Sequence, residues 1–175
     1  MKKILLGVSS SVSIYKSCEL ARKYVKEGFS VHVIMTKNST EMIRPLLFET
    51  ITGNPVFTDS FVRDYKLMGH IKLKENASIL VIAPATANII GKIANGIADD
   101  LLSTTFLSVT CPVIAAPAMN PDMWNNAAVT HNIDILKKRG VYIIEPVKGA
   151  VVCGDEGTGK LADIEQIYNE TKKLI

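Results

Sequence analysis

Three side chains that could do chemistry lie far apart in the sequence: the amide of Asn120, the imidazole of His70 and the thiol of Cys153. Asn120 belongs to Pro117–Trp124, which follows the apolar run Val113–Ala116, and it directly precedes a proline. Because Asn favours the helix cap and Pro the first helical position, a helix is predicted to begin at the end of a strand. Ligands bind at that edge of open α/β sheets, so Asn120 is a candidate for holding a substrate carboxylate. An ordinary helix cap is the alternative interpretation.

His70 and Cys153 are candidates for proton transfer. His70 is predicted at a junction between a loop and a helix, and an imidazole there suits a general base, or else has a structural role. Cys153 lies among the glycines of Lys148–Lys160, and a thiol that is neither in the core nor paired is a candidate acid or nucleophile. Cys18 lies on an apolar helix stripe and Cys111 precedes a proline, so both are predicted to pack.

Two segments could bind the phosphate and the ring of a nucleotide. Gly7-Val8-Ser9-Ser10-Ser11 separates the first apolar run from a helix, so its N–H groups and hydroxyls predict an anion site or a serine-rich cap. The segment lacks the dinucleotide and Walker glycine patterns, and Thr36 replaces an acid after the second strand, so a mononucleotide fits better. In Pro84-Ala85-Thr86-Ala87-Asn88, small residues admit a flat ring and two polar side chains offer hydrogen bonds, although Thr86 could equally cap a helix.

A further polar run, Asn95–Thr105, carries paired acids and three hydroxyls, among them Ser103. Paired acids alone are also typical of a solvated helix N-terminus.

Short apolar runs alternate with helical patterns along the whole chain. Strands are predicted at Lys3–Leu6, Val31–Met35, Ile79–Ala83, Val113–Ala116 and Val141–Ile144, with a shorter one at Pro55–Phe57. Helices are predicted from Ile14 to Gly28 and within Thr40–Thr52 (broken near Pro45), Thr86–Asn95, Ala98–Ser108, Asp122–Arg139 and Asp163–Lys173. Asp59–Met68 and Lys148–Lys160 are predicted to lack regular structure. This alternation predicts one α/β domain over residues 1–175, a doubly wound parallel sheet with helices on both faces.

Composition excludes several classes of protein. The 175 residues carry a net charge of +3 with scattered basic residues, which argues against nucleic-acid binding. No apolar run reaches the roughly 18 residues of a membrane span. Three widely spaced cysteines without zinc-ligand spacing predict no disulfide framework, no metal site and a reducing, cytoplasmic location.

Several motifs together resemble those of the homo-oligomeric flavin-containing cysteine decarboxylases. They are Pro117–Trp124, Pro84–Asn88, Asn95–Leu102, the Gly-His-Ile context of His70, and Val152-Cys153-Gly154-Asp155-Glu156-Gly157-Thr158-Gly159. The similarity spans Ile4 to about Ile167. Cys153 favours the branch of coenzyme A biosynthesis over the peptidyl-cysteine decarboxylases, which lack a cysteine there. A non-catalytic flavin-binding regulatory subunit is the other alternative.

The resemblance implies a flavodoxin-like, Rossmann-like three-layer fold that binds FMN. It implies decarboxylation of 4'-phosphopantothenoyl-L-cysteine to 4'-phosphopantetheine, with His70 as base or orienting group, Asn120 on the carboxylate and Cys153 as acid. The implied cofactor residues are Gly7, Ser9, Ser10, Thr36, Pro84, Ala85, Thr86, Ala87, Asn88, Ser103 and Ala118. The implied substrate residues are Asn120, Met119, Met123, Gly154 and Lys160. A homotrimer or a dodecamer of trimers is expected, free-standing or part of a fusion with the synthetase of the same pathway.

Overall fold

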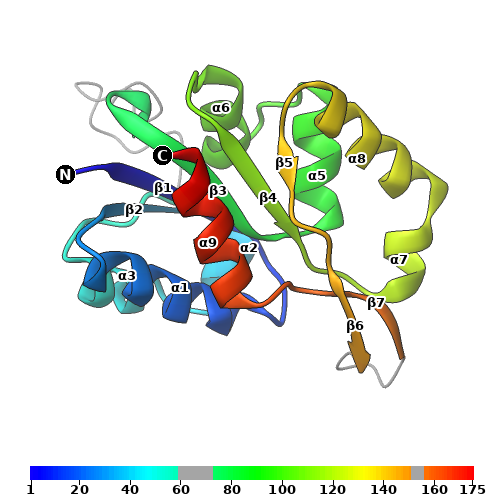
Figure 1. Cartoon of the computed structure of the whole chain (residues 1–175), viewed down its shortest axis with the longest axis horizontal. Helices are drawn as coiled ribbons and strands as arrows, with labels where there is room; N and C mark the ends of the chain where they lie inside the picture. The colour runs from blue at the N-terminus through cyan, green and yellow to red at the C-terminus, as the bar shows by residue number, and fades with distance from the viewer. Residues whose placement is uncertain (59–72, 151–155) are drawn as a thin grey trace.

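A five-stranded parallel sheet forms the middle layer of the computed structural model, which describes residues 1–58, 73–150 and 156–175 (Figure 1). The strands are β1 (Lys3–Val8), β2 (Ser30–Met35), β3 (Ala77–Ala85), β4 (Val113–Pro117) and β5 (Tyr142–Ile143). Their order, β2-β1-β3-β4-β5, is that of flavodoxin-like sheets and confirms the predicted fold. The order reverses between β1 and β3, so the carboxyl ends of these two strands border the edge where such folds bind ligands.

Helices cover both faces of the sheet because its strand residues point alternately to two apolar clusters. Ile4 and Leu6 of β1 pack in the cluster that includes residues of α1 (Ile14–Lys26), α3 (Pro45–Thr52) and α9 (Ile164–Leu174). Leu5 packs in the other, with residues of α5 (Ala87–Asn95), α6 (Leu101–Ser108) and α8 (Ala127–Lys138). Both clusters are fully buried at the sheet, and each such Leu or Ile contributes roughly 1.5–3 kcal/mol of transfer free energy.

Three expected elements differ from the structure. The helix expected over Asp122–Arg139 is two helices, α7 (Pro121–Asn125) and α8, because Asn126 leaves the helical conformation and caps α8 with its side chain. The sequence predicts no regular structure for Lys148–Lys160, but β6 (Val147–Ala150) and β7 (Glu156–Lys160) form an antiparallel hairpin. The strand expected at Pro55–Phe57 is reduced to a single bridge between Phe57 and Ile34.

Other expected helix ends hold in part. The helix expected within Thr40–Thr52 is confirmed from Pro45 onward as α3, which begins at the proline. Its first part is not helical, because the preceding helix α2 (Lys37–Thr40) ends where the expected helix begins. Asp163 caps α9 through the N–H of Glu165. The segment Asp59–Met68 lies outside the described residues.

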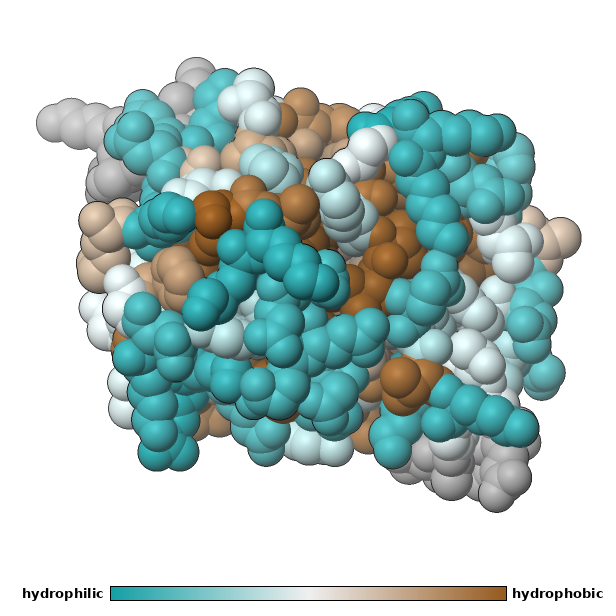
Figure 2. Space-filling view, in the orientation of Figure 1, coloured by the Kyte–Doolittle hydropathy of each residue, from teal (hydrophilic) through white to brown (hydrophobic). Residues whose placement is uncertain are grey.

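The C-terminal helix α9 packs against α1. The hydroxyls of Tyr24 and Thr171 form a buried hydrogen bond of 2.7 Å, and Lys23 pairs with Glu165 at 2.7 Å on the surface. Figure 2 shows mainly hydrophilic residues over the outer side of α9, as expected for an amphipathic helix with a solvated face. No helix within residues 1–58, 73–150 and 156–175 is long and apolar enough to cross a membrane.

Candidate functional site

Hydrogen bonds join the carboxyl end of β3 to the loops that follow β1 and β4. The Ser9 hydroxyl donates to the carbonyl of Pro84 at 2.7 Å and accepts the N–H of Thr86 at 3.0 Å. The N–H of Ala118 donates to the carbonyl of Ala85 at 3.0 Å. Three segments from distant parts of the sequence therefore form one surface at the carboxyl edge of the sheet, where the fold predicts a ligand.

Three of the predicted cofactor residues have structural partners of their own. Ser9 is buried, and its two bonds hold the β3 loop in place. A Cβ at Gly7 would lie 2.5 Å from a methyl group of Leu102, so a glycine there lets α6 approach β1 closely. Ser103 is buried in the capping box of Asp100 at the start of α6. Contact of these residues with a cofactor stays a prediction.

Other predicted cofactor residues present polar groups that have no hydrogen-bond partner within residues 1–58, 73–150 and 156–175. Neither Ser10 nor the side chains of Thr86 and Asn88 make a hydrogen bond to any described residue. Thr86 occupies the cap position of α5 but its hydroxyl does not cap the helix, contrary to the alternative interpretation. Ser10 and Thr86 are half-buried and Asn88 is exposed, and small alanines flank Thr86 in the sequence. This combination fits a flat polar ring with a phosphate group, as FMN has.

Thr36 directly follows β2 at the same edge of the sheet. Its N–H donates to the carbonyl of Val8 at 3.0 Å, which places it next to the end of β1. Its carbonyl accepts the hydroxyl of Ser39 at 2.7 Å within the short helix α2. The residue is half-buried, and no acidic side chain replaces it at this strand end, in keeping with a mononucleotide site.

Asn120 is the cap of α7, so the helix-cap interpretation is correct. Its Oδ1 atom accepts the N–H groups of Asp122 at 2.7 Å and Met123 at 3.4 Å. The oxygen is therefore committed to the helix, and a carboxylate could be recognised only by the Nδ2 group, which is a donor. The cap and the carboxylate site are compatible uses of the same side chain.

The β6–β7 hairpin lies against the Asn120 loop. The N–H of Met119 donates to the carbonyl of Gly159 in β7 at 2.9 Å. Met123 is 47% exposed on α7, and Lys160 is exposed at the end of β7, so both side chains can reach a ligand. His70, Cys153 and Gly154 lie outside the described residues, and their positions stay predictions.

Sequence reasoning missed an ion-pair network at the start of α6. Lys92 of α5 pairs with Asp99 at 2.7 Å and with Asp100 at 2.8 Å. Burial opposes ionisation of Asp100, but hydrogen bonds from Lys92 and the Ser103 N–H outweigh it and hold the pKa of Asp100 below its ordinary value. The Asp-x-x-Ser spacing is a capping-box variant that could have indicated this helix start.

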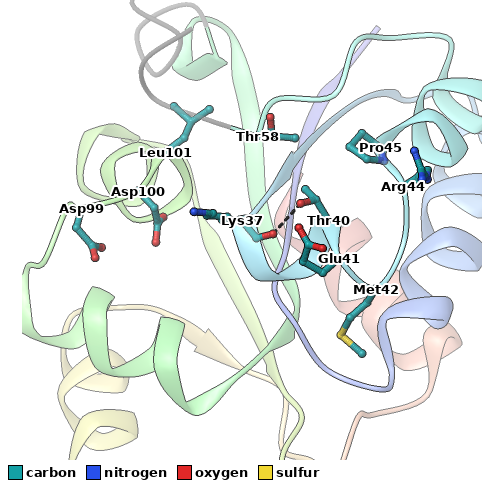
Figure 3. Close-up of a pocket in the computed structure, with 10 residues that line it drawn as sticks. All are labelled: Lys37, Thr40, Glu41, Met42, Arg44, Pro45, Thr58, Asp99, Asp100 and Leu101. Atoms are coloured by element: carbon teal, nitrogen blue, oxygen red, sulfur yellow. Dashed lines mark hydrogen bonds between the residues drawn. The ribbon is translucent and has the colours of Figure 1, made fainter.

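A cleft of about 900 Å³ lies between this network and helices α2 and α3. Figure 3 shows Lys37 pointing across the cleft toward Asp100, with Leu101 and Thr58 above these two residues in the view. Its lining carries charges of both signs and includes none of the predicted cofactor residues, so the cleft lies beside the predicted site. No cluster of His, Cys, Asp and Glu among the described residues is arranged to hold a metal ion.

Comparisons with known proteins agree with this geometry. The flavoprotein family model matches residues 1–175. The coenzyme A biosynthesis bifunctional protein CoaBC of Bacillus subtilis (strain 168) is 42% identical over 173 residues, which are 98% of this chain and 43% of that protein. The chain thus spans less than half the length of the curated relatives it matches.

Two solved structures share the fold along nearly the whole chain. A cysteine-to-serine variant of PPC decarboxylase, complexed with pantothenoylaminoethenethiol, has a TM-score of 0.87 at 31% identity and covers 98% of this chain and 97% of its own. The FMN-dependent cysteine decarboxylase SpaF has a TM-score of 0.84 at 33% identity and covers 98% of this chain and 95% of its own. By its full-length match, its relatives and its sheet order, the chain belongs to the flavoprotein family.

Proposed function

We propose that this chain binds FMN and decarboxylates 4'-phosphopantothenoyl-L-cysteine to 4'-phosphopantetheine, a step of coenzyme A biosynthesis. The observation that carries the proposal is the position of Asn120. The Ala118 N–H bonds to Ala85, so the loop that holds Asn120 is fixed beside the small-residue loop suited to a flat ring. A carboxylate-binding amide next to a flavin site is what an oxidative decarboxylase of a cysteine derivative requires.

The relatives support this substrate. One is named for coenzyme A biosynthesis, and the solved PPC decarboxylase structure holds a pantothenoyl enethiol. SpaF supports FMN as the flavin. A flavin with a single phosphate also agrees with Thr36 at the end of β2, where dinucleotide-binding sheets place an acid for the ribose.

FMN, when bound, would supply a two-electron oxidation of the substrate's thiol carbon and the later return of those electrons. The chain's own residues would hold it at the carboxyl edge of the sheet. Ser10 and its neighbouring N–H groups would bind the phosphate, and Thr86 and Asn88 would bind polar atoms of the ring. Ser9 would act indirectly, because its hydroxyl holds the Pro84–Thr86 loop.

Three side chains would handle the substrate. Asn120 would donate its Nδ2–H to the carboxylate; a neutral amide orients the group without opposing loss of its charge as a tight ion pair would. His70 would take or orient the proton of the oxidation step. Cys153 would donate a proton to the product carbon, a task for which a thiol is a far better acid than a hydroxyl.

We further propose that the protein is a cytoplasmic homo-oligomer whose site is shared between subunits. Half of the large exposed apolar side chains among the described residues lie around the start of α1 and around α2 and α3, and α1 packs against α3. A monomer would leave these side chains in water. They are Val12, Tyr15, Met42, Leu46 and Leu47. This surface is the candidate for subunit contact.

The test uses the purified protein. It should be yellow, release FMN rather than FAD or NAD on denaturation, and produce carbon dioxide from 4'-phosphopantothenoyl-L-cysteine. The product should be phosphopantetheine. Bound FAD would contradict the cofactor, and a yellow protein without turnover would be a regulatory flavoprotein. Release of an enethiol, or preference for a peptide with C-terminal cysteine, would place it with the peptidyl-cysteine decarboxylases.

A further inference from the structure

The β6–β7 hairpin touches the Asn120 loop through two glycines. Gly159 is buried, and its carbonyl accepts the Met119 N–H at 2.9 Å. A Cβ added at Gly159 would overlap the carbonyl oxygen of Met119 and lie 3.2 Å from the backbone of Asn120 and Pro121. The β7 backbone therefore rests directly on the backbone of the Asn120 loop, with no side chain between them.

Gly157 makes the second contact. A Cβ there would lie 2.7 Å from Cβ and 2.8 Å from Cγ of Pro121, the buried first residue of α7. Neither Gly157 nor Gly159 has a left-handed backbone, so these positions need the space that a glycine leaves rather than its conformational freedom. Gly149 provides the contrast, because a Cβ there would meet only the flexible Lys160 side chain, at 3.4 Å and beyond.

The residues just before β6 and just after β7 anchor the hairpin in the core. Ile144 precedes it, is buried, and donates its N–H to Ala115 of β4 at 3.0 Å. Leu161 and Ala162 follow it and are buried in the cluster beneath α9. Because the residues that flank the hairpin are buried and β7 contacts the Asn120 loop, the hairpin has a fixed position relative to Asn120.

We infer that Gly157 and Gly159 are positioning residues for the decarboxylation: their missing side chains seat β7 on the Asn120 loop and so set the hairpin against the carboxylate site. This inference rests on the proposed function. Cys153, the candidate acid, lies in the sequence between Ala150 and Glu156, so the contact of β7 with the Asn120 loop fixes the two ends of the segment that contains it. A displaced hairpin would impair delivery of the proton to the product while leaving the flavin-binding loops of β1 and β3 intact.

The experiment compares Gly157→Ala with Gly149→Ala in the full-length, FMN-loaded protein. The two glycines face each other in the hairpin register, so the control makes the same chemical change in the same hairpin without the obstacle. Gly157→Ala should retain FMN but lower kcat/KM by about 100-fold, the scale of a misplacement of about 1 Å, mainly through kcat. It should also release part of its product as the enethiol, two hydrogens lighter than phosphopantetheine. Gly149→Ala should match the unaltered protein in both.

A compensating variant identifies the cause. Pro121→Gly removes the two atoms that would obstruct the methyl group introduced by Gly157→Ala, so the double variant Gly157→Ala/Pro121→Gly should regain the rate and product ratio of Pro121→Gly alone. If Gly157→Ala does not retain FMN, the FMN content is compared instead, and the inference predicts that the double variant binds FMN again. An unchanged product ratio in Gly157→Ala, no recovery in the double variant, or an equal effect of Gly149→Ala would overturn the inference. Absence of carbon dioxide release by the unaltered protein would instead refute the proposed function.

Discussion

The side-chain amide of Asn120 would have two roles: its oxygen caps a helix and its nitrogen would bind the substrate. Its oxygen holds the first turn of α7 through the N–H groups of Asp122 and Met123. The amide nitrogen would donate a hydrogen bond to a substrate carboxylate. Replacing the donor while keeping the acceptor therefore separates catalysis from helix capping.

Asn120→Asp makes that separation. Aspartate caps helices as well as asparagine does, so folding and FMN content should be preserved. The new carboxylate cannot donate and would face the substrate carboxylate, a like-charge pair that costs several kcal/mol in a partly desolvated site. We expect kcat/KM for carbon dioxide release to fall by about 100-fold or more, since each 1.4 kcal/mol is a factor of ten. Steady-state kinetics and calorimetric binding of the substrate check this.

Asn126→Asp is the matched control, because Asn126 caps the next helix, α8, through the N–H of Ala128 at 2.9 Å. It makes the same chemical change at an exposed cap and should leave turnover unchanged. Equal substrate affinity in Asn120→Asp and the unaltered protein would mean that Asn120 serves the helix alone.

Cys153→Ser tests the acid that completes the reaction. A serine hydroxyl is a much weaker acid than a thiol, whose ordinary pKa is about 8.5, so proton delivery to the product should fail while oxidation and carbon dioxide loss continue. Without oxygen, one equivalent of carbon dioxide per site should form, the enethiol should accumulate, and the yellow colour should be lost. Mass spectrometry and absorbance follow these changes in a single turnover.

Cys111→Ser is the control, since Cys111 packs half-buried beside the second core cluster and should leave the product as phosphopantetheine. Phosphopantetheine from Cys153→Ser at the normal rate would exclude Cys153 as the acid.

At the scale of elements, the start of α6 is held by Asp100, which both caps the helix and pairs with Lys92. Asp100→Asn keeps a capping oxygen and loses the charge, so it should destabilise the protein by about 0.5 kcal/mol, a value kept small because the pair is partly exposed. Asp100→Ala also loses the cap and should cost about 1–2 kcal/mol. Urea unfolding at neutral pH measures both, and Asp99→Asn, which leaves the cap intact, is the control.

The pH dependence has a definite sign. The folded pKa of Asp100 lies below its ordinary value of 3.8, so its contribution is present above that value and is lost as pH falls through the folded pKa. The stability difference between the unaltered protein and Asp100→Asn should therefore shrink below about pH 3.8. A difference that stays constant down to acid unfolding would show that the Lys92–Asp100 pair does not stabilise the native state.

The elements that the sequence predicted well are those whose apolar residues form a clear pattern. The strand at Val113–Ala116 is a continuous apolar run buried on both faces of the sheet, and the helix from Ile14 buries one apolar stripe. The hairpin was missed because its glycines pack backbone against backbone, as Gly159 does on Met119, and this leaves no alternation of side chains. The break at Asn126 was missed because it depends on a single side chain, which follows α7 in an extended conformation and caps α8.

The site residues, too, were predicted well where a local pattern fixes them and poorly where distant strands do. The motif at Pro84–Asn88 was placed correctly at the sheet edge because a strand end fixes it. Ser9 and Ser10 are indistinguishable in sequence, yet only Ser9 is buried and bonded to the β3 loop. Partners that come from distant strands cannot be read from a local pattern.

At the scale of the whole molecule, the proposed site would be built from residues of two neighbouring subunits. Asn120, Ala118 and the Pro84–Asn88 loop lie together on one chain. The family resemblance implies that His70 acts on the flavin of a neighbouring subunit. His70→Asn should then be inactive while retaining FMN, and His131→Asn, on the exposed face of α8, should be fully active.

Subunit mixing tests the shared site directly. His70→Asn and Asn120→Asp should each be inactive alone, but an intact His70 from one variant can meet an intact Asn120 from the other across a subunit contact. After dissociation and reassembly of an equal mixture, roughly a quarter of the contacts in a cyclic oligomer pair the two intact residues. The mixture should regain activity in about that proportion, and mixing without dissociation should regain none. A reassembled mixture that stays inactive would mean that each chain carries its own complete site, and the exposed apolar surface from Val12 to Leu47 would then need another partner.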